Sequence, residues 1–276
     1  MNSRIVYTAR SEKKKTGSRR RALARFGAVL VFFGVVTGIV MMLGAEQFQV
    51  KTVSFSGLKI LSAEELKTKI FQEISGAYVW LFPKRSIFLV RASVLGDALQ
   101  KEFPRLRTVA VGRKFPAALA VAVEERELWA ILCNDANTPE NAEDITCVYI
   151  DETGFAFEEA PYSIGSLILK IRTDFPEVRV GEQALAPEIA QSIRLLETRI
   201  GETGLRVWRY EFLKQVPSEI RVETDEGFAL IFLREDDFAN TFRVLKTVLE
   251  QEIKEKRKDL EYIDLRFGNK VFFKMR

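Results

Sequence analysis

The longest apolar run in the chain, FGAVLVFFGVVTGIVMMLGA at 26–45, contains no charged residue. An α-helix of this length rises about 30 Å, which matches the hydrocarbon core of a bilayer. The pattern therefore predicts one transmembrane helix. The alternative is a cleaved signal peptide, whose apolar stretch would be only about 7–15 residues long. The run also ends in Leu43-Gly44-Ala45, with a leucine where a cleavage site requires a small residue.

Hydrophobic periodicity after this helix predicts a small α+β domain. Val53 and Phe55 alternate with polar residues, as in a half-buried strand. Ser62 precedes Glu65 in a capping box, which marks the start of an amphipathic helix. The order predicted is β-α-α-β-β. Its elements are a strand at 49–57, helices at 62–74 and 90–103, the second with Val94 on its apolar face, and a hairpin of 106–115 with 118–125.

Beyond residue 127, short β-rich runs separated by turn residues predict a second domain of mainly antiparallel strands, so the fold class is α+β. Asp236 and Asp237 are suitable N-cap residues for a C-terminal helix. Gly268-Asn269, between two β-rich runs, is a two-residue hairpin signal. The elements predicted are strands at 128–133, 147–151, 155–159, 206–213, 219–225 and 228–233, helices at 189–200 and 238–258, and a hairpin of 262–267 with 270–274.

Positive charge is concentrated at the N-terminus, where residues 1–25 hold nine Lys or Arg residues and one acid, Glu12. Basic residues beside a first span remain in the cytoplasm. We therefore expect a cytoplasmic tail and an exported remainder, as in a single-pass type II protein of the cell inner membrane. The whole chain is only +4, so its exported part is net negative. The sequence pI of about 9.0 reflects the tail, and no nucleic-acid partner is expected.

Cys133 and Cys147 are the two cysteines of the chain. In an exported protein, two cysteines separated by a polar loop predict a disulfide rather than a metal site, and two buried free thiols are the alternative. Closing a loop of about fifteen residues would stabilise the fold by about 3 kcal/mol. The bridge would require an oxidising compartment such as a periplasm.

The composition argues against catalysis. The chain has no histidine, which removes the commonest general base and the commonest metal ligand. It has no GxxxxGK[ST] or GxGxxG motif either, so we expect no cofactor, metal, catalytic residue or small-molecule substrate. The carboxylate pairs Glu124-Glu125 and Glu158-Glu159 lie on predicted strands, where neighbours point to opposite faces. They are interpreted as solvated surface, and a membrane-anchored cell-wall enzyme remains the third hypothesis.

The terminal hairpin is predicted to present an edge strand, whose unpaired backbone groups accept a strand of another chain. The alternative is that Asp264 and Arg266 form only a structural ion pair and that Phe272 and Phe273 belong to the core. With Gly268-Asn269 as the turn, an unbroken ladder pairs Phe267 with Lys270, Arg266 with Val271, Leu265 with Phe272, Asp264 with Phe273, Ile263 with Lys274 and Tyr262 with Met275.

Small residues mark one face of the membrane helix. Gly34 and Gly38 form a GxxxG motif, and Gly27 lies seven residues before Gly34. Glycines at this spacing allow a second helix to approach closely. These three glycines are therefore candidates for transmembrane packing. Glycine is common in membrane spans, so the alternative is that this face binds nothing.

Five motifs follow the membrane helix in this order: VKTVSFSGL at 50–58, RKFP at 113–116, VEER at 123–126, YIDETG at 149–154 and YIDLRFGN at 262–269. In order and spacing they resemble the FtsQ/DivIB family of bacterial cell-division proteins. The first motif resembles the opening strand of that family's POTRA domain, and the β-α-α-β-β order is similar to POTRA topology. The other four resemble the family's R-x-(W/F)-P, V-x-E-R, (V/I)-D-x-x-G and Y-(I/V)-D-L-R-(F/Y) in turn.

The resemblance implies an architecture of tail (1–25), transmembrane helix (26–45), POTRA domain (48–126) and FtsQ-type β domain (127–276). It implies a non-catalytic divisome scaffold at the division septum that binds FtsB and FtsL and links them to septal wall synthases. A POTRA-type polypeptide transport or assembly chaperone is the main alternative. Residues 133–147 are longer than the hairpin expected there, so they resemble an insertion. The partner-binding residues implied by position are Arg266, Phe267, Lys270, Val271, Phe272, Phe273 and Lys274.

Overall fold

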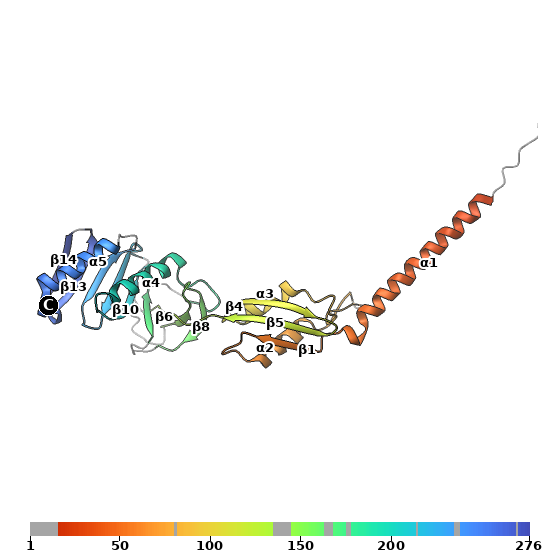
Figure 1. Ribbon diagram of the computed structural model, residues 1–276, viewed down its shortest axis with the longest axis horizontal. Coiled ribbons are helices and arrows are strands. Elements are labelled where there is room, and N and C mark those ends of the chain that lie inside the picture. The colour runs from red at the N-terminus through yellow and green to blue at the C-terminus, as the bar shows by residue number, and fades with distance from the viewer. Residues whose placement is uncertain are drawn as a thin grey trace, which may run out of the picture. The chain divides into compact units, whose positions relative to one another are not determined.

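The computed structural model describes residues 16–79, 82–134, 145–162, 168–174, 178–213, 215–234, 238–268 and 270–276 (Figure 1). Its first element is helix α1 (Thr16–Gly44), which begins before the predicted span. Leu23–Gly44 is the one helix in these ranges that is long and apolar enough to cross a membrane, and none of its residues is buried within the chain. Most of the predicted tail at 1–25 lies outside the described residues.

Contacts divide the chain into two units. Unit 1 runs up to Ser54 and includes Glu64–Leu95 and Val111–Val121. Unit 2 comprises Phe55–Ala63, Gly96–Ala110 and Ala122–Arg276. The division therefore cuts through each of the three strands of the first sheet.

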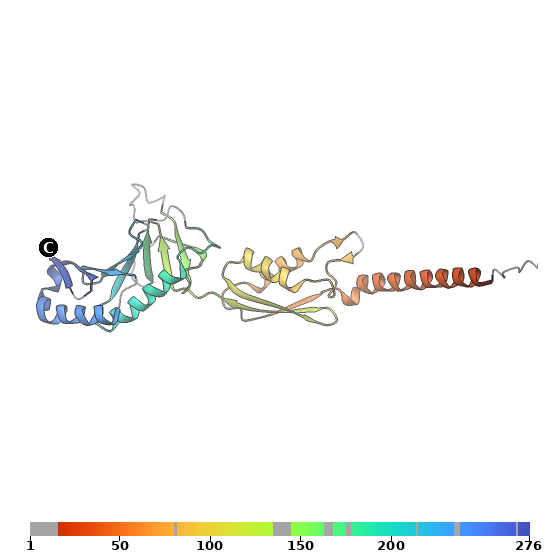
Figure 2. The same cartoon turned by 90° about the horizontal axis from the view of Figure 1, so that it is seen from above.

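The first sheet has the strand order β1-β5-β4, with two helices on one of its faces (Figure 2). Its elements are β1 (Thr52–Ser56), α2 (Ala63–Glu73), α3 (Ala92–Glu102), β4 (Leu106–Lys114) and β5 (Ala118–Glu125). They give the predicted β-α-α-β-β order. A short hairpin of β2 (Ala77–Tyr78) and β3 (Phe82–Pro83) is inserted between the helices, and a 3-10 turn, η1 (Glu46–Phe48), follows α1.

The apolar face of α3 differs from the prediction at one position. Leu95 and Leu99 are buried as expected, but Val94 is 54% exposed. Gly96 lies on the buried side instead, where a Cβ would sit 3.4 Å from the carbonyl oxygen of Val109. A glycine lets the helix approach β4 closely, and the leucines on either side complete the contact.

Unit 2 contains a mixed nine-stranded sheet in the order β14-β13-β12-β11-β10-β9-β6-β7-β8. The pairs β6/β9, β9/β10 and β12/β13 are parallel and the others are antiparallel. The prediction missed β9, which lies in the middle of this order. The strands are β6 (Ala130–Cys133), β7 (Cys147–Ile150), β8 (Ala156–Ala160), β9 (Leu169–Thr173), β10 (Val207–Phe212), β11 (Glu219–Thr224), β12 (Ala229–Leu233), β13 (Leu260–Phe267) and β14 (Lys270–Met275).

Helices α4 (Pro187–Gly201) and α5 (Phe238–Thr247) lie along one face of this sheet and enclose the main core (Figure 2). Pro187 is the first residue of α4, a position where its missing N–H costs nothing. The opposite face carries ion pairs between neighbouring strands, including Arg209 with Glu223 at 2.6 Å. The core is built from strand residues such as Tyr210 and Phe232 together with one side of each helix.

The C-terminal helix is shorter than predicted. Continuous α-helix ends at Thr247, a π-helical turn, η3 (Val248–Ile253), follows, and a 3-10 segment, η4 (Lys254–Asp259), leads into β13. Leu249 and Ile253 keep the buried face through η3. The sequence KEKRKD then has no apolar side chain to bury, so packing cannot continue the helix. The predicted caps Asp236 and Asp237 lie outside the described residues.

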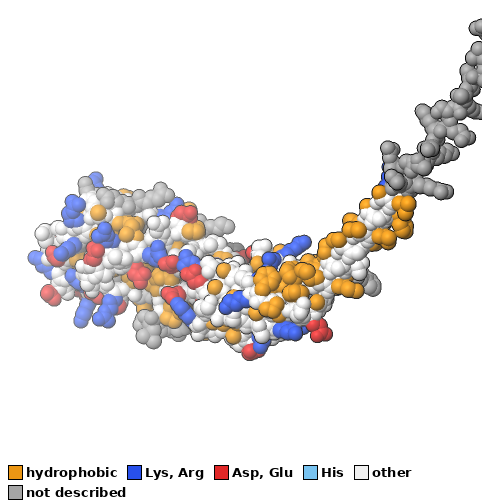
Figure 3. Space-filling model, turned by 45° about the vertical axis from the view of Figure 1, so that its right-hand side comes forward, with side chains coloured by type: hydrophobic (Ala, Val, Ile, Leu, Met, Phe, Trp, Pro, Cys, Tyr) orange, Lys and Arg blue, Asp and Glu red, His pale blue; other side chains and the backbone are white. Residues whose placement is uncertain are grey.

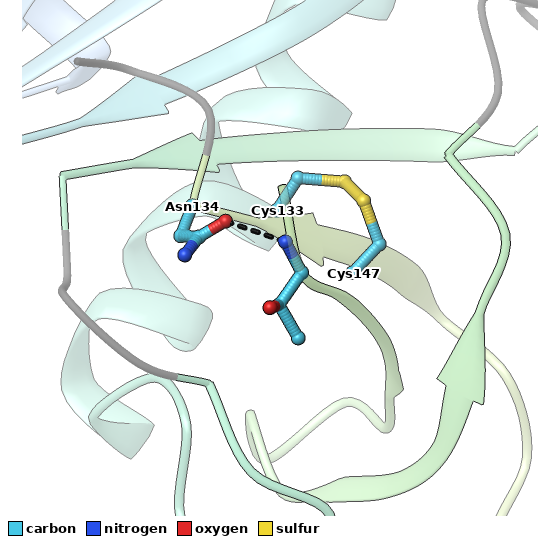
Figure 4. The surroundings of a disulfide bond; sticks show 4 residues. Cys133, Asn134 and Cys147 are labelled. Atoms are coloured by element: carbon cyan, nitrogen blue, oxygen red, sulfur yellow. Dashed lines mark hydrogen bonds between the residues drawn. A yellow bond between two sulfur atoms is a disulfide. The ribbon is translucent and has the colours of Figure 1, made fainter. Parts of the chain in front are cut away.

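The structure contains a disulfide between Cys133 and Cys147, which are directly opposed residues of the antiparallel pair β6/β7 (Figure 4). The two Cα atoms are 4.2 Å apart. Beyond the bridge, the side-chain oxygen of Asn134 accepts a hydrogen bond of 2.7 Å from the backbone N–H of Thr146. The disulfide thus joins the two ends of the segment 133–147, whose residues 135–144 lie outside the described part of the chain.

Candidate functional site

The terminal hairpin places β14 at one edge of the nine-stranded sheet. β13 pairs with it on one side, and the described residues contain no strand on the other. Main-chain groups along that open side are therefore available to a further strand.

The register of this hairpin differs from the prediction. Phe267 pairs with Lys270 as expected, but Asp264 pairs with Phe272, Ile263 with Phe273 and Tyr262 with Lys274. Two residues of β13, Leu265 and Arg266, therefore lie opposite Val271 alone, which is a β-bulge. A second irregularity lies between Leu260 and Tyr262.

Asp264 gives the physical reason for the first bulge. Its carboxylate accepts the backbone N–H of Arg266 at 3.1 Å and the guanidinium of the same residue at 2.8 and 2.5 Å. A side chain that takes a backbone N–H in this way competes with the strand ladder. Burial alone would raise the pKa of Asp264, but these bonds to Arg266 outweigh it, so the pKa lies below its ordinary value.

The guanidinium of Arg266 is used mainly in contacts within the fold. Besides Asp264, its guanidinium forms an ion pair with Glu219 on β11. The hydrogen bonds that its guanidinium donates to Asp264 and Glu219 raise the pKa of Arg266. The structural ion pair considered above is therefore present, and it holds the bulge beside Phe267.

The aromatic residues of the hairpin are exposed, so the alternative that Phe272 and Phe273 belong to the core is wrong. Phe267, Phe272 and Phe273 are 53%, 54% and 44% exposed. Val271 packs against the main core, so Phe273 shares its face and Phe272 points to the other. The Phe272 ring contacts that of Phe267 edge to face, with the centroids 5.1 Å apart. Each face of the edge strand therefore carries a large exposed ring.

Lysines flank Phe272 on its own face. Lys270 and Lys274 are both exposed, and Lys274 forms an ion pair of 2.6 Å with Glu261. The hydrogen bond to Glu261 raises the pKa of Lys274. The surface around Phe272 is thus apolar at its centre, with the Lys270 cation at one end and the Lys274–Glu261 ion pair at the other.

Glu125 is a buried cap, and its interpretation as solvated surface is wrong. It is 4% exposed, and its carboxylate accepts the backbone N–H groups of Lys59, Ile60 and Leu61 at 2.8–3.1 Å. Burial alone would raise the pKa of Glu125, but these three bonds outweigh it, so the pKa is lowered. The last residue of β5 thereby fixes the loop between β1 and α2.

Two of the family-like motifs meet in unit 2. Arg126 pairs with Asp151 at 2.5 Å and lies 3.9 Å from the centroid of the Phe155 ring. Asp151 also accepts the backbone N–H and hydroxyl of Thr153 at 2.9 and 2.6 Å. Burial would raise the pKa of Asp151, but the bonds from Thr153 and Arg126 lower it overall. The two motifs therefore have a structural role that neither spacing nor composition indicated.

Glu158 and Glu159 are exposed, as their interpretation as solvated surface predicts. Glu158 also forms an ion pair with Arg105, whose guanidinium lies 4.8 Å from the centroid of the Phe157 ring.

The pKa of Glu125 predicts a pH-dependent loss of stability. Because the folded pKa lies below the ordinary value of 4.5, the stabilisation is complete above pH 4.5 and is lost as pH falls through the folded pKa. We expect Glu125→Gln to lower the unfolding free energy at pH 7 by about 1.5–3 kcal/mol, as for a buried hydrogen bond to a charged group. Urea unfolding should show this gap shrinking towards pH 3. Glu124→Gln, at the exposed neighbour, is the control, and an equal gap at both pH values would contradict the role of the charge.

Beyond the adjacent residues and the backbone of α1 itself, no atom of the described residues lies within 4 Å of a Cβ added at Gly27, Gly34 or Gly38, so the structure places no second segment of the described chain on this face. Within the described ranges, no group of three His, Cys, Asp or Glu residues could hold a metal ion.

Together, these features define a class of protein: an N-terminal apolar helix that supports single-pass membrane anchoring, followed by an α+β chain that ends in an open edge strand. Residues 48–126 match the model of the POTRA domain, FtsQ-type. With the apolar helix before it, this domain fits a protein of the FtsQ/DivIB family, whose members are non-enzymatic scaffolds. The match supports a division-related scaffold for protein interactions. Comparison with curated proteins gave no match.

Proposed function

We propose that the protein is a bitopic divisome scaffold that binds FtsB-like and FtsL-like division proteins and links them to septal wall synthases. In this proposal the N-terminus is cytoplasmic, the remainder lies beyond the inner membrane at the septum, and the chain has a POTRA domain at 48–126 and a β domain at 127–276. Binding, without catalysis, is its activity.

The observation that carries this proposal is the open strand β14. A partner strand would gain main-chain hydrogen bonds along the strand and contacts with Phe272 on one face or Phe273 on the other. Phe267 extends the first of these surfaces, and the Lys270 cation favours an acidic partner. Lys274 could exchange Glu261 for an acid of that partner. Val271 anchors the strand to the core, and Arg266 holds the bulge that positions Phe267.

The test is capture of a short bitopic coiled-coil partner by the full-length chain in detergent. We expect Phe272→Glu to weaken capture at least about 30-fold, which corresponds to an interface hot spot of about 2 kcal/mol. Phe272→Pro should do the same by removing a backbone donor. Tyr162→Glu is the matched control, because Tyr162 is 51% exposed and lies just after the opposite edge strand, β8.

Circular dichroism of each variant establishes that the domain is folded. Unchanged capture by folded Phe272→Glu protein would contradict binding at the edge strand.

The alternative, a transport or assembly chaperone, would also use strand addition. It predicts that an unfolded polypeptide competes with the coiled-coil partner, and that depletion leaves division intact. The scaffold predicts filamentous or enlarged undivided cells on depletion. The enzyme hypothesis requires wall hydrolysis by the purified chain that a Glu substitution abolishes.

A further inference from the structure

Three aromatic side chains form a chain of contacts in unit 1, immediately after the membrane helix. The ring centroid of Phe88 lies 5.2 Å from that of Phe48 and 5.6 Å from that of Phe115. Phe115, at the turn between β4 and β5, is 62% exposed, and the other two rings are partly exposed. The described fold does not require such an exposed ring at a hairpin turn.

The position of this cluster is fixed close to the end of α1. Phe48 follows Gly44 by four residues, so even a fully extended chain keeps it within about 14 Å. Backbone bonds then fix it to unit 1: the carbonyl of Phe48 accepts the N–H of Ile87 at 2.8 Å, and Val50 donates to the carbonyl of Arg85 at 2.9 Å. Because the apolar helix ends at Gly44, the aromatic cluster lies at the depth of the lipid headgroups or just outside them.

The charge of unit 1 after α1 is net positive. Its segments 45–54, 64–95 and 111–121 contain eight Lys or Arg residues and four acids. Lys51 and Lys114 are exposed and have no ion-pair partner among the described residues. Figure 3 shows one face of this region, on which hydrophobic side chains lie next to the end of α1 with Lys and Arg side chains around them. This local excess contrasts with the net negative charge of the chain after residue 25.

We propose that Phe48, Phe88 and Phe115, together with Lys51 and Lys114, form an aromatic–basic patch that rests in the headgroup layer of the anionic bilayer holding α1. Aromatic rings partition into the membrane interface, and nearby lysines are attracted to anionic lipids. The membrane is the occupant that the structure favours, because the patch is tied to the membrane helix by four residues and its charge is complementary to that surface. The patch would restrict how far unit 1 moves from the bilayer.

Brominated lipids test this contact, because they quench tryptophan fluorescence only at short range. The full-length chain is reconstituted in nanodiscs of brominated phosphatidylglycerol, and Phe115→Trp is compared with Ile60→Trp. Ile60 is also an exposed apolar residue, at 71%, and lies in unit 2. The natural tryptophans are the same in both variants. We expect the added tryptophan at 115 to be quenched at least about twofold more than that at 60.

Charge variants test the basic half of the patch. In the Phe115→Trp protein, K51Q/K114Q should reduce quenching in phosphatidylglycerol at least about twofold, and K67Q/K69Q on α2 should leave it unchanged. Brominated phosphatidylcholine should quench less than phosphatidylglycerol. Equal quenching at 115 and 60 would overturn the proposal and leave the patch to a protein partner. If the extent of quenching changed neither with lipid charge nor in K51Q/K114Q, the role of the lysines would be overturned.

Discussion

Replacing Asp151 by Ala is expected to lower the unfolding free energy of the protein by about 3–5 kcal/mol, the cost of breaking a buried ion pair by removing one partner. Asp151 is 2% exposed and pairs with Arg126, whose side chain is 14% exposed. The substitution leaves the Arg126 guanidinium with its Phe155 contact and a bond to the Pro104 carbonyl, but with no counter-charge at this position. It also removes the acceptor of the Thr153 and Phe155 N–H groups.

The neighbouring residue supplies the control for this prediction. Glu152 is about half exposed and forms ion pairs with Arg107 at 3.4 Å and Arg194 at 2.9 Å. Exposed pairs of this kind contribute at most about 1 kcal/mol, so Glu152→Ala should have a small effect. Urea unfolding of the full-length chain in detergent, followed by circular dichroism, measures both. If the two variants unfolded at the same urea concentration, the buried contacts of Asp151 would contribute no more to stability than the exposed ion pairs of Glu152.

Periodicity predicted strands such as β5 and β11 because one face of each is buried and the other is more polar. In β5 and β11, buried positions alternate with more exposed ones along nearly the whole strand. β9 was missed although it also alternates: Leu169 and Ile171 are apolar, and Lys170 and Arg172 are polar. The strand is only five residues long, so its period-two signal is brief. Its place between β6 and β10, parallel to both, depends on long-range pairing that periodicity does not encode.

The candidate site was predictable as a location but not in its details. The hairpin signal at Gly268 placed the terminal strand correctly, and the strand lies at the edge of the described sheet. The bulge depends on Asp264 accepting the N–H of Arg266, a local competition that strand periodicity does not encode. The pairing of Arg126 with Asp151 joins residues 25 apart in sequence, so only the folded chain reveals it.

The role of Glu125 could not be predicted from strand periodicity either. Alternation along β5 indicates on which face a side chain lies. It does not indicate whether backbone N–H groups of another segment lie on that face. The donors belong to the loop after β1, 64–66 residues away in sequence. That loop begins at Gly57.

Gly57→Ala is expected to destabilise the fold by more than about 3 kcal/mol, because two costs combine. Gly57 has φ = +87°, which a residue with a side chain adopts at a cost of about 1–2 kcal/mol. An added Cβ would also lie 2.0 Å from the carbonyl oxygen of Val123, so the loop or β5 must move. Movement there would weaken the bonds from the loop to Glu125.

Gly76→Ala separates the two costs. Gly76 has φ = +80°, but an added Cβ would meet nothing within 4 Å. It should therefore lose only the conformational term of about 1–2 kcal/mol. Urea unfolding measures the difference between the two variants, and hydrogen exchange at the amides of Lys59, Ile60 and Leu61 should rise in Gly57→Ala alone. Equal losses of stability in the two alanine variants would show that the close approach of Gly57 to Val123 does not hold the loop in place.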